Sequence, residues 1–225
     1  MGTAYNANIV TDGLVLCLDA ANPRSYPGSG TAWYDLSGRG NHGALINGPV
    51  FSSNDRGSIS FDGSNDYVNC GNDNSLNMST EATLIHWLKF NGYNWSPFIG
   101  KITNRYVANF RVWIGSDRQF DVELTNTSYK PLFTVSSAEL PTNSWCNLAV
   151  RFKSNGDLSG FFNGSEKNTV TKSIGSINSS NFLIGPDTGG FYGSGAISYI
   201  QLYNRALSND EIRQNFNATR GRYGI

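Results

Sequence analysis

The chain has 225 residues, and its 17 Lys and Arg residues balance 17 Asp and Glu residues, so the formal net charge is zero. The sequence contains no cluster of basic residues that could neutralise phosphates or anionic lipids. We therefore do not expect nucleic acids or membrane surfaces as partners. The 25 glycines and the 13% of aromatic residues are typical of many turns that join half-buried strands. We therefore expect an all-β protein with a single domain over residues 1–225.

The N-terminal segment MGTAYNANIVTDG lacks a charged region followed by an apolar one. No later window approaches the roughly 20 apolar residues of a membrane span. We expect no signal peptide and synthesis in the cytoplasm. Cys17, Cys70 and Cys146 each lie in an apolar alternation, without the spacing of a C-x-x-C or Cys/His site, and we interpret them as small core residues.

Apolar and polar residues alternate along much of the chain, which predicts strands separated by turns, as in a sandwich or barrel. The predicted strands span residues 13–18, 57–63, 66–70, 82–90, 96–102, 106–115, 119–125, 130–136, 144–153, 158–163, 167–173, 181–185 and 196–204. The Gly-rich segment 21–49 is expected to be an ordered loop across the sheet ends. Its apolar anchors are Trp33, Tyr34, Leu36, Leu45 and Ile46.

Two Asn-Gly pairs predict hairpins. Asn163 and Gly164 separate two extended runs, and both residues tolerate the positive φ that a type I′ turn demands. Asn155 and Gly156 repeat the pattern between residues 144–153 and 158–163.

The segment LSNDEI predicts the start of a C-terminal helix. Ser208 and Glu211 have the spacing of a capping box, and Leu207 is placed to pack on Ile212 as a hydrophobic staple. Ile212 and Phe216 share one face, so we expect about three turns of helix that dock on the sandwich.

A short basic tail follows this helix. We expect it to have no core role, to be dispensable for folding and to be available to a neighbouring subunit. The candidate partner-binding residues are Arg220, Arg222 and Tyr223.

Five segments, taken in order, resemble the laminin G-like branch of the concanavalin A-like lectin/glucanase superfamily. They are GLVLCLDAANPRSYPGSGTAWYDLSGRGNHGAL, SISFDGSNDYVNCG, ATLIHWLKF, SWCNLAVRFKSNGDLSGFFNG and GAISYIQLYNRALSNDEIRQNF. The resemblance implies a jelly-roll sandwich of two antiparallel sheets with one short C-terminal helix. It implies functions that range from glycan binding and glycan hydrolysis to structural association, so the fold does not settle the function.

Two stretches, DAANPRSYPGSGTAWYDLSGRGNHG (19–43) and NRALSNDEIRQNFNATRGRYGI (204–225), together with the missing signal peptide, resemble single-domain members from tailed bacteriophages, especially phages of cyanobacteria and other aquatic bacteria. This resemblance implies a virion protein that is made in the host cytoplasm and released by lysis. The expected partners are other virion proteins, such as the major capsid protein.

Catalysis of the glucanase kind would need two or three carboxylates on one strand face. Asp121 and Glu123 in FDVEL share a face, but they stand in the wrong order and lack the third member of the family pattern. We interpret them as a solvated strand face and expect a non-enzyme.

Calcium is a weaker alternative, because oxygen ligands gather in two loops. Asp and Asn next to Gly more often bond their own backbone in a turn, so we expect no cofactor and keep calcium open. The candidate ligands are Asp62, Asn65, Asp66 and Asp187.

Two further features are interpreted as structural. SGRGNHG (37–43) lacks the Gly-Lys-Ser/Thr ending of a phosphate loop. His42 and His86 have no nucleophile motif near them.

A glycan site requires aromatic rings in exposed loops, where they can stack on sugar faces. The alternative is that such rings only cap the sheet ends. The candidate glycan-binding residues are Tyr93, Trp95, Phe191 and Tyr192.

These observations favour a non-catalytic phage virion protein. We expect a capsid decoration or a head or tail appendage that docks on other virion subunits and touches host-surface glycans. A soluble bacterial carbohydrate-binding lectin is the main alternative, and a glycan hydrolase with an atypical site is the second. Self-association into a homo-oligomer stays open.

Overall fold

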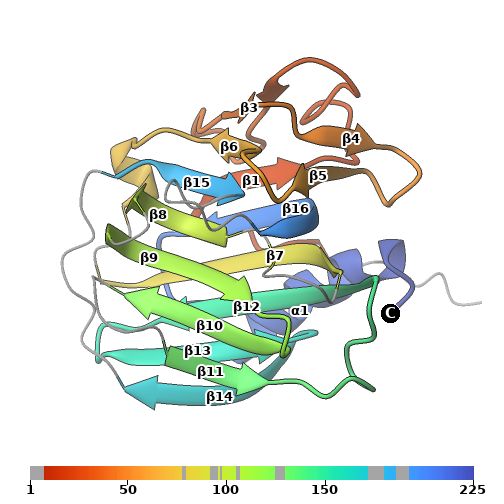
Figure 1. Cartoon of the computed structure of the whole chain (residues 1–225). Coiled ribbons are helices and arrows are strands. Elements are labelled where there is room, and N and C mark those ends of the chain that lie inside the picture. Colours follow the sequence, from red (N-terminus) through yellow and green to blue (C-terminus); the bar gives the residue numbers. More distant parts are fainter. Residues whose placement is uncertain are drawn as a thin grey trace, which may run out of the picture.

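The computed structural model describes residues 8–77, 80–91, 96, 98–104, 107–124, 130–171, 180–185 and 193–225. Two antiparallel sheets pack face to face, and helix α1 (Asn209–Thr219) lies behind the first sheet in Figure 1. The predicted all-β sandwich with one short C-terminal helix is therefore confirmed.

The first sheet has the strand order β14-β13-β12-β7-β16-β5-β4, and β1 also pairs with β16. Its strands are β1 (Leu14–Asp19), β4 (Val50–Ser52), β5 (Ser58–Asp62), β7 (Ala82–Phe90), β12 (Ser144–Phe152), β13 (Asp157–Phe162), β14 (Ser165–Thr171) and β16 (Ser194–Tyr203).

The second sheet has the strand order β11-β10-β9-β8-β15-β6-β3-β2. Its strands are β2 (Ala32–Trp33), β3 (Gly43–Ile46), β6 (Tyr67–Asn69), β8 (Phe98–Asn104), β9 (Val107–Ile114), β10 (Gln119–Leu124), β11 (Lys130–Thr134) and β15 (Phe182–Gly185). Late strands lie in the middle of both sheets, since β15 separates β6 from β8 and β16 separates β5 from β7. Distant parts of the chain must therefore meet before either sheet is complete.

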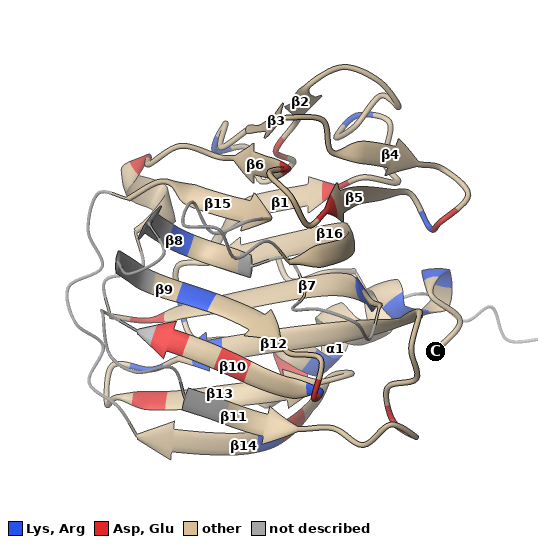
Figure 2. Cartoon of the chain, in the orientation of Figure 1, with Lys and Arg blue, Asp and Glu red and all other residues tan. Residues whose placement is uncertain are grey.

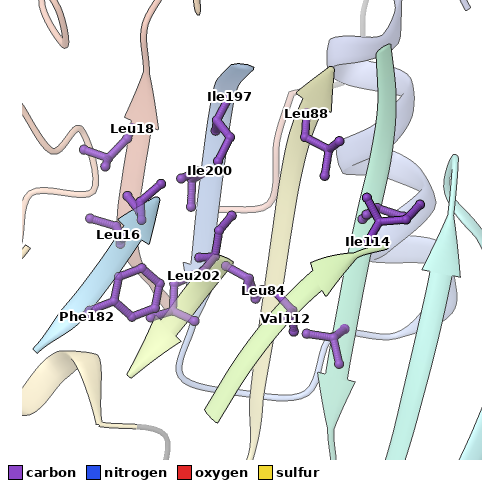
Figure 3. Packing of buried hydrophobic residues seen from close by; sticks show 14 of the residues in the cluster. Leu16, Leu18, Leu84, Leu88, Val112, Ile114, Phe182, Ile197, Ile200 and Leu202 are labelled. Carbon is purple, nitrogen blue, oxygen red and sulfur yellow. The ribbon is translucent and has the colours of Figure 1, made fainter. Parts of the chain in front are cut away.

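The main core lies between the two sheets, where apolar side chains of facing strands meet (Figure 3). Phe110 of β9 contacts Phe152 of β12 edge to face, with ring centroids 4.9 Å apart. Leu84 and Leu88 alternate along β7 with residues that point to the opposite face, and both are fully buried. The alternation read from the sequence thus places one apolar row of each strand in this core.

A second apolar layer covers the outer face of the first sheet. Trp87 of β7 points away from the main core and stacks on Phe216 of α1, with ring centroids 5.7 Å apart. Tyr223 follows α1 and the 3-10 turn η2 (Arg220–Arg222), and it stacks on the same indole at 3.8 Å. Because Tyr223 is only 6% exposed, the expectation that the tail has no core role is wrong.

The predicted helix start is confirmed in detail. The Ser208 side chain accepts a hydrogen bond from the Glu211 backbone at 3.2 Å, and the Glu211 side chain accepts one from the Ser208 backbone at 2.8 Å. Leu207 and Ile212 are both buried in the layer under α1. Docking on the sheet thus stabilises a helix that is too short to be stable in isolation.

The predicted strands occur with shifts of a few residues at their ends, and residues 82–90 form β7 with the predicted bounds. The segment 21–49 differs from its prediction, because it contains β2 and β3, which extend the second sheet. These strands are too short for an alternation to reveal. Trp33 and Leu45 are buried as expected, whereas Tyr34 is 44% exposed and anchors nothing in the core.

The two Asn-Gly turns differ. Asn163 (φ 48°) and Gly164 (φ 74°) both adopt the left-handed conformation, which confirms the type I′ prediction between β13 and β14. In the other hairpin only Gly156 has positive φ, and its backbone N–H donates to the Lys153 carbonyl at 2.9 Å. This hairpin is therefore not type I′. Its loop ends in a single left-handed residue, Gly156.

The three cysteines are free thiols and buried, as expected. In the described part of the chain, no helix is long and apolar enough to cross a membrane.

Candidate functional site

Asp121 and Glu123 lie on the outer face of β10, opposite the core residues Phe120 and Val122. Asp121 is 6% exposed and Glu123 is 7% exposed. The expectation of a solvated strand face is therefore wrong: these carboxylates are buried on the side of the sheet away from the main core. Buried acids need partners, so the groups around them decide what this face can do.

Arg111 on the neighbouring strand β9 lies opposite Glu123. Its Nε donates to Glu123 Oε2 at 2.6 Å, and Nη2 contacts the same oxygen. The guanidinium also lies 5.5 Å from the ring of Trp113, two residues along β9. Because the ion pair is mostly shielded from solvent, it fixes both side chains more firmly than a surface pair would.

Asp121 lies opposite Trp113 in the same strand pair. Within the residues that the structure describes, Asp121 Oδ1 is buried and has no hydrogen-bond partner. Burial, with a smaller contribution from the negative charge of Asp117, raises the pKa of Asp121 to about 7. A buried carboxylate oxygen without a hydrogen-bond donor destabilises the folded state. A ligand or a proton that binds this oxygen removes that free-energy cost.

An apolar strip continues across the sheet from these polar groups. Trp113 clusters with Leu183 of β15, and the half-buried Tyr67 of β6 packs against them. We call the set Arg111, Trp113, Asp121 and Glu123 the strand-face cluster. It combines an aromatic ring, a fixed ion pair and a carboxylate oxygen that lacks a donor, which suits a ligand carrying both hydroxyl groups and an apolar face.

The sequence model of the concanavalin A-like lectin/glucanases superfamily matches residues 62–213. This chain belongs to that superfamily. No curated protein sequence matches the chain significantly.

Solved structures share the superfamily sandwich at low sequence identity. Trypanosoma rangeli sialidase in complex with the inhibitor DANA matches with a TM-score of 0.69 at 16% identity, over 95% of this chain and 35% of that one. The binding domain of botulinum neurotoxin serotype D matches with a TM-score of 0.70 at 16% identity, over 93% of this chain and 53% of that one.

A structure of botulinum neurotoxin type C, whose cell entry is described as dependent on two ganglioside molecules, matches with a TM-score of 0.69 at 18% identity. That match covers 93% of this chain and 52% of the toxin chain. The present chain thus spans about a third to about a half of these structures. Likeness at such identities shows the fold alone.

The glucanase pattern of the superfamily drew attention to Asp121 and Glu123, but no motif pointed to Arg111 and Trp113. The sequence signal for the whole cluster is the pairing of two alternations, Arg111 and Trp113 in FRVW with Asp121 and Glu123 in FDVE. Each alternation places its residues on one face, but only the register between β9 and β10 brings Arg111 to Glu123.

The candidate glycan-binding residues Tyr93, Trp95, Phe191 and Tyr192 lie outside the described residues, and so does Asp187 of the calcium candidates. Their predicted roles stay predictions.

Two of the three remaining calcium candidates, Asp62 and Asp66, accept hydrogen bonds from the backbone of their own turn. Asp62 Oδ1 accepts from the Ser64 backbone at 2.7 Å, and this lowers the pKa of Asp62. Asp66 Oδ2 accepts from the Asp62 backbone at 3.1 Å, and burial raises the pKa of Asp66. Asn65 is exposed, and its carbonyl accepts from the Asn47 side chain at 2.9 Å. Among the described residues no group of three or more His, Cys, Asp and Glu side chains is placed to hold a metal ion.

The segment SGRGNHG is organised around Asp35. Asp35 Oδ1 accepts from the backbones of Cys17 and Ser37 at 2.8 Å and 2.9 Å, and Asp35 Oδ2 accepts from that of Asn41 at 3.1 Å. His42 Nδ1 accepts from the Asp35 backbone at 3.0 Å. These contacts tie the segment to β1 and agree with its structural interpretation.

The three tail candidates have different surroundings. Arg222 forms two hydrogen bonds with Asp19 of β1, at 2.7 Å and 2.8 Å. Tyr223 is buried against Trp87, while Arg220 is exposed and lies over the Phe216 ring at 5.8 Å. Tyr223 therefore belongs to the packing of this chain, which corrects its assignment to a surface for a partner.

Proposed function

We propose that this chain is a non-catalytic carbohydrate-binding protein whose glycan binds at the strand-face cluster. The observation that carries the proposal is that Asp121 Oδ1, beside Trp113, has no hydrogen-bond partner among the described residues. A sugar hydroxyl supplies the donor that this oxygen lacks, and the C–H face of the sugar packs on the indole ring. The superfamily membership and the binding domains among the structural neighbours support this class of ligand.

Access to the cluster shapes the expected kinetics. Trp113 is 7% exposed and Asp121 6%, so neighbouring groups must move aside before a sugar makes contact. Binding that requires such a rearrangement is slower than the typical range of about 10⁵ to 10⁷ M⁻¹s⁻¹. We therefore expect slow association and a long equilibration time in any binding assay.

A glycan array tests the proposal. The wild type, Asp121→Asn and the matched control Asp210→Asn are compared, because Asp210 lies on the exposed start of α1, away from the second sheet. We expect the wild type and the control to bind the same glycans and Asp121→Asn to lose them. An array without any signal for the wild type would contradict the proposal.

The non-catalytic assignment rests on Glu123. Most glycosidases use a pair of carboxyl groups that flank the bond to be broken. Here Arg111 donates to Glu123 Oε2 at 2.6 Å, so that oxygen is already occupied. Release of reducing sugar by the wild type that Asp121→Asn and Glu123→Gln each abolish would overturn this assignment.

We propose further that the protein works on a phage particle, docked on other virion proteins such as the major capsid protein. The support is the resemblance of residues 19–43 and 204–225 to single-domain phage members. Mass spectrometry of purified particles tests it. Finding the chain among the virion proteins is the expected result, and its absence from the particles would contradict this setting.

A further inference from the structure

A cavity of about 350 Å³ lies where the C-terminal tail meets the β4–β5 loop and the turn after β1. We call it the tail pocket. Figure 2 shows basic segments in the β4–β5 loop and in the turn that follows α1. The residues that matter for its chemistry are Ala21, Phe51, Ser53, Asn54, Arg56 and Arg222. None of them belongs to the strand-face cluster.

The charge of the tail pocket is positive. Arg222 is neutralised by Asp19, which accepts two of its hydrogen bonds at 2.7 Å and 2.8 Å. Asp55 is neutralised by Lys89 at 3.0 Å. In the described part of the chain, the guanidinium of Arg56 has neither an ion pair nor a hydrogen bond. The pocket therefore carries one unmatched positive charge, and this charge is able to pair with an anion in a bidentate manner.

The backbone beneath Arg56 is fixed. Ser198 of β16 donates to the Gly57 carbonyl at 2.7 Å and contacts the Arg56 carbonyl at 3.2 Å. Tyr223 in turn donates to Ser198 at 2.9 Å. Gly57 has φ 63°, and a side chain there would come within 2.4 Å of the Ala21 backbone, so only glycine permits this approach. The loop that presents Arg56 is thus held in place before any ligand arrives.

The other walls offer contacts for an organic body attached to the anion. Phe51 presents a partly buried ring whose centroid lies 5.0 Å from that of Tyr26. Ser53 and Asn54 supply hydroxyl and amide groups beside it. A ring on one side and polar groups on the other suit a sugar, and the volume is at the small end of the range for ligand pockets.

We propose that the tail pocket binds the carboxylate-bearing unit of an acidic sugar, with the carboxylate on Arg56 and the sugar ring against Phe51. This site is separate from the strand-face cluster. The C-terminal tail then has a second role besides packing, because Arg222 lines the pocket and Tyr223 fixes its floor through Ser198.

Nuclear magnetic resonance titration of the full chain tests this proposal. The probes are glucuronic acid and N-acetylneuraminic acid, with glucose as the neutral sugar and acetate as the carboxylate without a sugar. We expect at least one acidic sugar to bind with a dissociation constant near or below about 1 mM and to shift the amide signals of residues 53–57. Glucose and acetate are expected to bind at least about tenfold more weakly.

Variants locate the site. Arg56→Gln is expected to weaken the acidic sugar at least about tenfold, and Arg56→Lys to give an intermediate affinity because it keeps the charge without the planar fork. The matched control Arg39→Gln, at an exposed arginine of another loop, is expected to bind as the wild type does. Asp121→Asn is also expected to leave this binding unchanged, which separates it from glycan binding at the strand-face cluster.

Three results would overturn the proposal. One is that neither acidic sugar shifts residues 53–57. Another is that acetate or glucose binds as tightly as the acidic sugars, since the site would then not recognise both parts of the ligand. The third is that Arg56→Gln retains the wild-type affinity.

Discussion

Tyr223 stacks on Trp87 with ring centroids 3.8 Å apart and ring planes inclined by 10°. The two residues come from the end of the chain and from the central strand β7 of the first sheet. Trp87 also stacks on the Phe216 ring and is fully buried. The tail is therefore a cover for the outer face of the first sheet.

Deleting residues 220–225 is expected to destabilise the protein by at least about 3 kcal/mol, because it removes a buried aromatic ring and uncovers Trp87. Deletion of residues 224–225 alone is the matched control, since Ile225 is 42% exposed. Chemical denaturation measures both. Equal free energies of unfolding for the two deletions would show that Tyr223 contributes nothing to the fold.

His86 of β7 points into the main core, opposite Leu148 and Ile200 on the adjacent strands. Its Nδ1 is buried and has no partner among the described residues, and burial lowers the pKa of His86 to about 3. The unfolded chain takes up this proton near pH 6.5, whereas the folded chain resists it. The stability that depends on neutral His86 is therefore complete above about pH 6.5 and is lost as the pH falls toward 3, by up to about 1.4 kcal/mol per pH unit.

His86→Leu is expected to remove this dependence. The free energy of unfolding of the variant, relative to the wild type, should rise between about pH 8 and about pH 5. Denaturation at both values measures the change, with the wild type at each pH as the reference. A difference between variant and wild type that is the same at both values would mean that His86 does not titrate as expected.

The pH dependence of stability that Asp121 causes is opposite in sign to that of His86. The pKa of Asp121 is raised to about 7 in the folded chain, mainly by burial, against about 3.9 in an unfolded chain. The folded state therefore keeps this proton to a higher pH than the unfolded state does. As a result, stability falls as the pH rises from about 4 to about 7. Asp121→Asn should gain stability relative to the wild type over this window, as measured by denaturation at its two ends. If the free energies of unfolding of Asp121→Asn and the wild type differ by the same amount at both pH values, the raised pKa of Asp121 is contradicted.

The sequence predicted the fold well where a structure depends on neighbouring residues. Alternation along residues 82–90 gave the bounds of β7, and the capping box at Ser208 and Glu211 gave the start of α1. The short strands β2, β3 and β4 were missed because two to four residues carry no readable period. Their formation depends on pairing in the sheets, of β3 with β6 and of β4 with β5.

The candidate site was less predictable than the fold. Alternation places Asp121 and Glu123 on the outer face of β10, but it does not show whether that face is covered. Their burial and the contact of Glu123 with Arg111 depend on pairing with β9. The role of Tyr223 likewise depends on where the tail returns to Trp87, for which the local sequence holds no signal.

Isothermal titration of the best glycan from the array into the wild type and Asp121→Asn is the sharpest test of glycan binding at the strand-face cluster. We predict that Asp121→Asn loses about tenfold in affinity, because its neutral amide oxygen accepts a weaker hydrogen bond than the buried carboxylate does, while Asp210→Asn binds as the wild type does. We also predict that the wild type binds more tightly at about pH 8 than at about pH 6, because the ionised carboxylate accepts the sugar hydroxyl. Unchanged affinity in Asp121→Asn at about pH 8 would contradict glycan binding at the strand-face cluster.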